Sequence, residues 1–151
     1  MDKWLTRWQE LKGKHPKALL YTISTLLPMT IMLVVWFFMG SYPFGNKSLM
    51  AVDFGQQYIS FFGLLKHAVL TGDLSSLTYS FTKSLGGDMI GVLGYYLMSP
   101  FNIFYIIIPF KHYGLAVFLT IWLRYGAIGL SFSHFLIKRY KGAESRVWLV
   151  P

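Results

Sequence analysis

Hydrophobic residues occupy three long segments of this chain, at 18–40, 89–110 and 113–137. The first two segments carry no Asp, Glu, Lys or Arg, and the third carries only Arg124. About 20 apolar residues cross the hydrocarbon core of a bilayer as an α-helix, so each segment is long enough to span a membrane. The pattern predicts an all-α fold of transmembrane helices, in which 18–40 is retained rather than cleaved as a signal peptide.

A different pattern fills the connection 41–88. Within 52–70, apolar side chains recur every three or four residues and polar side chains fall on the opposite side. This spacing predicts an amphipathic helix that lies at the membrane surface with its apolar face toward the lipid. The predicted apolar face holds Phe54, Tyr58, Phe61, Phe62, Leu65 and Val69, and the polar face holds Asp53, Gln56, Gln57, Ser60 and His67.

Composition agrees with a membrane protein. Only 13% of the 151 residues are charged and 54% are hydrophobic, whereas about 25% of a soluble domain is charged. The chain has no cysteine, which excludes disulfides, thiolate metal sites and a cysteine nucleophile.

The net charge of +8 is concentrated beside the apolar segments. Residues 1–17 and 138–151 each have a net charge of +3, whereas 41–88 is neutral. Such flanks are typical of membrane orientation and not of nucleic-acid binding. We therefore expect 1–17 to be a basic cytoplasmic lead-in, 41–88 to be an extracytoplasmic loop, and 138–151 to be a basic tail.

The apolar segments and the charges lead to different numbers of membrane crossings. Three full crossings would place the two basic flanks on opposite sides, although the positive-inside rule favours the cytoplasm for both. We expect three crossings; the alternative is that 89–110, which contains glycine and proline, dips into the membrane and returns. The ending RVWLVP resembles the start of another apolar segment, so we expect a longer polytopic protein of which this is the N-terminal part.

Asp53 is the leading candidate for chemistry, because it follows the first apolar segment and begins the polar face of 52–70. It could act as a general base on an acceptor hydroxyl, or simply cap a helix. Gln56 and Gln57 lie one helical turn further on, where they could bind a substrate or orient the carboxylate.

Two further charged residues lie in or beside apolar segments. Asp88 precedes 89–110, and is either a cap for the next helix or a second carboxylate that holds substrate or a divalent metal with Asp53. Two aspartates alone are too few ligands to define a metal site. Arg124 lies within 113–137, where an arginine is functional by default. It would contact a phosphate or form a structural ion pair with a further helix.

Several motifs in order resemble the start of the bacterial YfhO family of multi-pass membrane proteins: DFGQQYISFF, then YSFTKSLGGDMIG, YYLMSPFN and LRYGAIGLSF. This family is similar to the GT-C class of glycosyltransferases, which transfer a sugar from a polyprenyl-phosphate carrier on the outer face of the membrane. In that class an acidic residue in the first outer loop is the catalytic base or positions the acceptor, and Asp53 occupies that place.

The resemblance implies a GT-C-like fold and transfer of a sugar to an envelope polymer such as lipoteichoic acid, at the bacterial cytoplasmic membrane. By the same resemblance Asp88 would be a second acidic site residue and Arg124 a phosphate contact. We expect Gln56, Gln57, Tyr58, Asp88 and Arg124 to bind substrate. A divalent metal is left open as a cofactor. The alternative is a protein without enzymatic activity, either a lipid-carrier flippase or a scaffold subunit of an envelope machine, which would not need Asp53.

Overall fold

The computed structural model describes residues 16–81 and 85–140. Most of the predicted lead-in 1–17 and of the predicted tail 138–151 therefore lies outside the described residues. The chain divides into two compact units, one of Met1–Val35 with Trp122–Pro151 and one of Trp36–Ile121. The elements are α2 (Pro16–Met39), η1 (Phe54–Tyr58), α3 (Ile59–Thr71), η2 (Leu74–Leu77), β1 (Tyr79–Ser80), β2 (Gly87–Asp88), α4 (Ile90–Val92), η3 (Leu93–Leu97), η4 (Pro100–Asn102), α5 (Ile103–Ile107), η5 (Phe110–His112) and α6 (Tyr113–Arg139).

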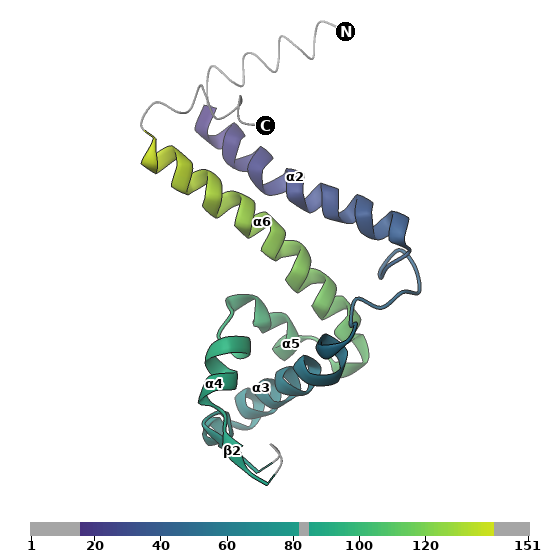
Figure 1. Cartoon of the computed structure of the whole chain (residues 1–151), viewed down its shortest axis with the longest axis vertical. Helices are drawn as coiled ribbons and strands as arrows, with labels where there is room; N and C mark the ends of the chain where they lie inside the picture. Colours follow the sequence, from purple (N-terminus) through teal and green to yellow (C-terminus); the bar gives the residue numbers. More distant parts are fainter. Residues whose placement is uncertain (1–15, 82–84, 141–151) are drawn as a thin grey trace, which may run out of the picture. The chain divides into compact units, whose positions relative to one another are not determined.

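Two helices dominate the structure, and both are long and apolar enough to cross a membrane (Figure 1). The stretches that qualify are Lys17–Met39 in α2 and Phe110–Arg139, which includes α6. The hydroxyls of Thr22, Thr25 and Thr30 donate to backbone carbonyls one turn earlier in α2, which satisfies these polar groups inside the helix. The predicted all-α membrane fold is confirmed.

Helices α2 and α6 are antiparallel in the first unit. Early in α2, the hydroxyl of Tyr21 lies 3.0 Å from Nδ1 of His134, near the end of α6. Further along α2, the backbone carbonyl of Met29 accepts a hydrogen bond of 3.1 Å from the indole of Trp122. The start of α2 and the end of α6 therefore lie at the same end of this helix pair.

This packing bears on the two predicted topologies. Three full crossings would make α2 and α6 parallel, whereas the helix pair is antiparallel. The segment between them is broken, because Ile90–Leu97 and Pro100–Ile107 meet at an angle of 88°. A bend of this kind fits either a broken span or a re-entrant loop, so the number of crossings stays a prediction.

Asn102 holds the bend of this broken segment. Its side-chain amide donates to the backbone carbonyls of Tyr96 at 2.8 Å and Leu97 at 3.1 Å. The residue is only 1% exposed. Since a helix break frees carbonyls that the hydrocarbon region cannot satisfy, the buried amide takes the place of the missing helical donors.

The second unit has its core along α3. Phe62, Leu65 and Ala68 are buried there, and the ring of Phe62 stacks on Tyr105 of α5 with centroids 3.9 Å apart. The expectation that the apolar face of 52–70 lies toward lipid is therefore wrong for these residues, because protein covers them. Val69, at the end of the predicted face, is exposed.

Two local features of this unit were not predicted. The chain makes a short antiparallel pair in which Tyr79 faces Asp88 and Ser80 faces Gly87. The ammonium group of Lys66 in α3 donates a hydrogen bond of 2.6 Å to the carbonyl of Ile108, the residue that ends α5. A cation at a helix C-terminus is favourable, so Lys66 fastens α3 to α5.

Candidate functional site

Asp53 stands at the start of the turn that leads into α3. Its side chain is exposed and makes no capping hydrogen bond to the backbone of η1. The interpretation of Asp53 as a helix cap thus finds no support in its geometry. The carboxylate is open to solvent, as a group that removes a proton from an incoming hydroxyl must be.

The backbone beside Asp53 is strained. Val52 has φ of 51°, a left-handed conformation that a β-branched residue rarely adopts. Such strain persists only where the surrounding structure imposes it, and it is concentrated at functional sites. The next residues form a π-helical turn, Phe54–Tyr58, which is also rare and often found at functional sites.

A second π-helical turn lies opposite the first. Tyr58 ends η1 and Tyr96 lies in η3 (Leu93–Leu97), and their rings are 4.6 Å apart. Tyr95 meets Tyr96 edge to face, also with ring centroids 4.6 Å apart, and its side chain is 80% exposed. The two turns thus place aromatic side chains together, with the ring of Tyr95 open to solvent.

Hydrogen bonding to the side chain of Tyr96 is the largest cause that raises the pKa of Tyr58 above its usual value near 10. Desolvation raises that pKa further, as do the nearby Tyr96, Tyr95 and Asp53. Asp53 is the smallest of these causes, and it directly precedes the turn that ends at Tyr58. Asp53 and these aromatic residues together form the candidate site.

Gln56 and Gln57 lie in the same π-helical turn as Tyr58, and both are exposed. A side-chain amide carries two donors and an acceptor, so each can bind hydroxyl groups in either sense. Of the residues predicted for the site, the structure thus brings together Asp53, Gln56, Gln57 and Tyr58.

Asp88 has a structural role in the same unit. Its Oδ1 accepts a hydrogen bond of 3.0 Å from the backbone N–H of Ile90, the first residue of α4. The N-cap position of α4 is Met89, which makes no side-chain capping bond, so Asp88 lies one residue before the position that the capping interpretation predicts. A role in substrate binding remains a prediction.

Arg124 is half-buried in α6, and it belongs to the first unit, whereas Asp53 belongs to the second. Its predicted contact with a phosphate stays a prediction. Among residues 16–81 and 85–140, no group of three or more His, Cys, Asp or Glu side chains is arranged to hold a metal ion.

Sequence reasoning missed the contribution of Tyr95 and Tyr96. In the sequence these tyrosines suggest only packing or an aromatic belt at the membrane surface. They lie 37 and 38 positions after Tyr58 along the chain, and no local signal connects the two stretches. Only the fold brings η3 to η1.

The long apolar helices define a helical membrane protein, and the candidate site combines Asp53 with aromatic residues of η1 and η3. The model of a family described as bacterial membrane protein YfhO matches residues 24–150. The chain belongs to this family, which confirms the predicted resemblance. No curated protein matches the chain, and no solved structure matches it.

Proposed function

We propose that this chain carries the acceptor-activating site of a membrane glycosyltransferase. The enzyme would transfer a sugar from a polyprenyl-phosphate carrier to a cell-envelope polymer, such as lipoteichoic acid, on the outer face of the membrane. The observation that carries the proposal is Asp53: an exposed carboxylate that caps no helix, next to strained Val52 and to the tyrosine pair.

In the proposed reaction, Asp53 accepts the proton of an acceptor hydroxyl as its oxygen attacks the anomeric carbon. The bond from that carbon to the carrier oxygen breaks, and the carrier phosphate leaves with the electron pair. General-base catalysis by a positioned carboxylate contributes about 10²- to 10⁴-fold in rate. The carboxylate only accepts a proton and forms no bond to the sugar. The acceptor oxygen therefore displaces the carrier in one step, which inverts the configuration at the anomeric carbon.

The neighbouring residues suit a sugar. Gln56 and Gln57 offer amide donors and acceptors for sugar hydroxyls. The exposed ring of Tyr95 offers an apolar face for the C–H face of a sugar ring. Arg124 belongs to the other unit, and its assignment to the carrier phosphate rests only on its chemistry, since a guanidinium binds phosphate oxygens in a bidentate manner.

The test uses the full-length protein in a bacterial strain that lacks it. Wild type, Asp53→Asn and Asp73→Asn are expressed at equal level, and purified lipoteichoic acid is examined for sugar by mass spectrometry. Asp73 is a matched control because it is an exposed aspartate of the same connection, where its Oδ1 accepts a hydrogen bond from Ser75.

We expect sugar with wild type and Asp73→Asn, and at least a hundredfold less with Asp53→Asn. Normal sugar with Asp53→Asn would refute the assigned role of Asp53. If wild type adds no sugar to any envelope polymer, the proposal of a transferase fails and the flippase or scaffold alternative replaces it.

A further inference from the structure

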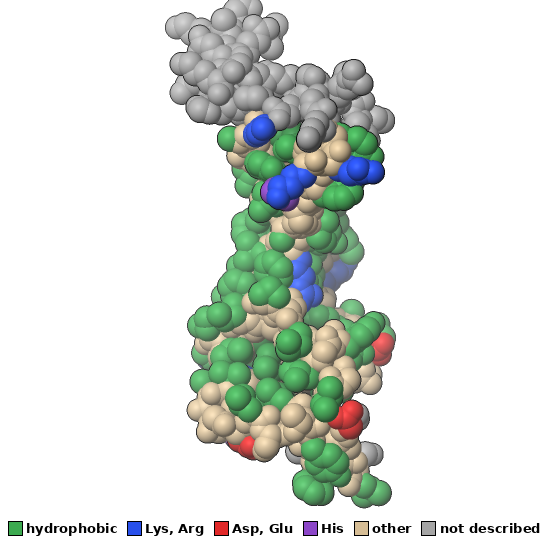
Figure 2. All heavy atoms as spheres, turned by 90° about the vertical axis from the view of Figure 1, so that its left-hand side faces the viewer, with side chains coloured by type: hydrophobic (Ala, Val, Ile, Leu, Met, Phe, Trp, Pro, Cys, Tyr) green, Lys and Arg blue, Asp and Glu red, His purple; other side chains and the backbone are tan. Residues whose placement is uncertain are grey.

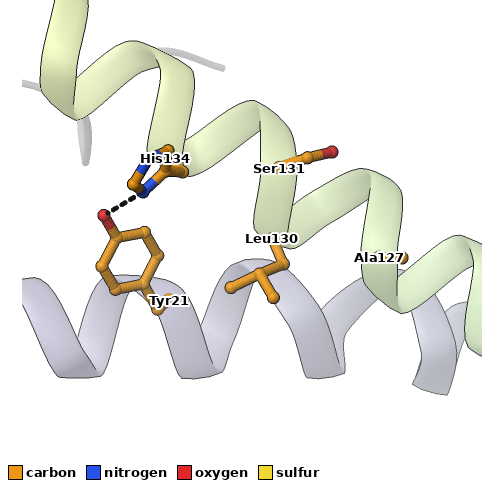
Figure 3. A pocket seen from close by; sticks show the side chains of 5 residues that line it. All are labelled: Tyr21, Ala127, Leu130, Ser131 and His134. Atoms are coloured by element: carbon orange, nitrogen blue, oxygen red, sulfur yellow. Dashed lines mark hydrogen bonds between the residues drawn. The ribbon is translucent and has the colours of Figure 1, made fainter.

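A pocket lies between the start of α2 and the end of α6, within the first unit. It has a volume of about 500 Å³ and is lined by Tyr21, Ala127, Leu130, Ser131 and His134. Figure 3 shows Leu130 directed toward α2 and Tyr21 reaching from α2 to His134. The lining is almost entirely apolar, apart from the polar atoms of Tyr21, Ser131 and His134.

Helical periodicity places a basic residue beyond the pocket on each helix. Lys17 precedes Tyr21 by four residues in α2, and Lys138 follows His134 by four residues in α6. Residues four apart lie on the same face of a helix. Both lysines are exposed, and each lies one turn closer to the helix end than the polar pair Tyr21 and His134.

The charged side chains in the described part of this unit are all positive. Residues 16–35 and 122–140, the described part of this unit, include Lys17, Arg124, Lys138 and Arg139 and no Asp or Glu. In Figure 2, blue and purple side chains gather at this end, beside the grey atoms, and no red side chain is visible there. The charged side chains of the described part of this unit are therefore all basic.

We propose that this pocket binds an anionic phospholipid. One acyl chain would lie against Leu130 and Ala127, and the headgroup phosphate would lie one turn further out, between Lys17 and Lys138. Basic pockets between transmembrane helices at the cytoplasmic side are suited to anionic headgroups, and lysine side chains extend readily toward the membrane surface. The volume falls within the range of about 300–1,000 Å³ that is usual for ligand pockets.

This inference is independent of sugar transfer, since it rests on the other unit and needs no chemical step. It is tested with full-length protein purified in a neutral detergent. Native mass spectrometry measures the binding of phosphatidylglycerol, which is anionic, and of phosphatidylcholine, which has the same apolar chains but no net charge.

The charge variant is Lys17→Gln with Lys138→Gln. Its matched control is Lys47→Gln with Lys111→Gln, which removes the same charge from exposed lysines of the second unit. A second variant, Ser131→Trp, fills the pocket without changing its charge. Each basic residue near a headgroup contributes about fivefold to binding, so two contribute tenfold or more.

We expect wild type and the control to prefer phosphatidylglycerol by about tenfold or more, the charge variant to lose this preference, and Ser131→Trp to bind both lipids less. Equal binding of the two lipids by wild type would overturn the proposal, as would an equal loss in the control. Displacement of the lipid by inorganic phosphate would indicate a phosphate site instead. Preferential binding of a polyprenyl phosphate would assign the pocket to the carrier, and would also overturn the proposal.

Discussion

Gly129 of α6 lies directly against the backbone carbonyl oxygen of Ser24 in α2, and any Cβ at position 129 would overlap that oxygen. The carbonyl of Ser24 is the one that loses its helical donor, because the residue four positions later is Pro28 and has no N–H. Glycine permits the close approach of two membrane helices and offers a Cα–H group to such a carbonyl. The proline of one helix and the glycine of the other thus form a single packing contact.

Gly129→Ala should destabilise the helix pair. The added methyl group must push α6 away from α2, and overpacking of this kind costs about 1–3 kcal/mol. Thermal unfolding of the full-length protein in detergent measures the change. The matched control is Gly91→Ala, since a Cβ at position 91 meets nothing within 4 Å. An unchanged unfolding temperature for Gly129→Ala would show that the two helices are not packed as described.

Both basic flanks should be labelled from the same side of the membrane. The sequence has no cysteine, so Lys17→Cys, Ser48→Cys and Tyr140→Cys introduce defined targets for a membrane-impermeant thiol reagent. Because α2 and α6 are antiparallel, positions 17 and 140 should react only after the membrane is opened. Position 48, beyond the other end of α2, should react in intact cells. Labelling of position 140 in intact cells would contradict the antiparallel pair.

Asn102→Leu should destabilise the bent segment, because two backbone carbonyls lose their buried donor. Each unsatisfied buried polar group costs about 1–3 kcal/mol, so a total loss of roughly 2–6 kcal/mol is expected for the two carbonyls. Asn46→Leu is the control, since Asn46 is exposed. Thermal unfolding and protease resistance are the measurements, and equal stability of the two variants would mean that Asn102 does not hold the bend.

The Tyr58–Tyr96 hydrogen bond should give stability that depends on alkaline pH. Since the fold raises the pKa of Tyr58, the folded state favours the protonated phenol. This contribution is fully present below about pH 10, the pKa of an unperturbed tyrosine, and is lost as the pH rises through the higher pKa of the folded state. Unfolding measured from pH 8 upward should show wild type losing more stability above pH 10 than Tyr58→Phe. Parallel curves would argue against the bond.

The sequence and the structure agree most closely where hydropathy alone decides. The apolar segment 113–137 corresponds to α6, because a long uncharged run has few alternatives to a helix in or near a membrane. Hydropathy carries no information about direction, however, so the 88° bend could not be deduced from it. That information lies in particular contacts, such as Asn102 with the carbonyls of Tyr96 and Leu97.

The candidate site likewise contains residues that the sequence indicates and residues that only the fold brings together. Asp53 and Asp88 could be chosen as candidates from their places beside the apolar segments, and their roles in chemistry stay predictions. The π-helical turn at Phe54–Tyr58 has no distinct sequence signature, and the approach of Tyr96 to Tyr58 depends on long-range packing. Chemistry-bearing residues were therefore visible in the sequence, but their neighbours were not.

The 88° bend has a consequence for how the apolar segments of this chain are counted. A segment that enters and leaves the membrane on the same side adds apolar residues, but it does not change the side on which the next helix begins. Counting 89–110 as a span reverses the assigned direction of α6, and with it the side of Lys138 and Arg139.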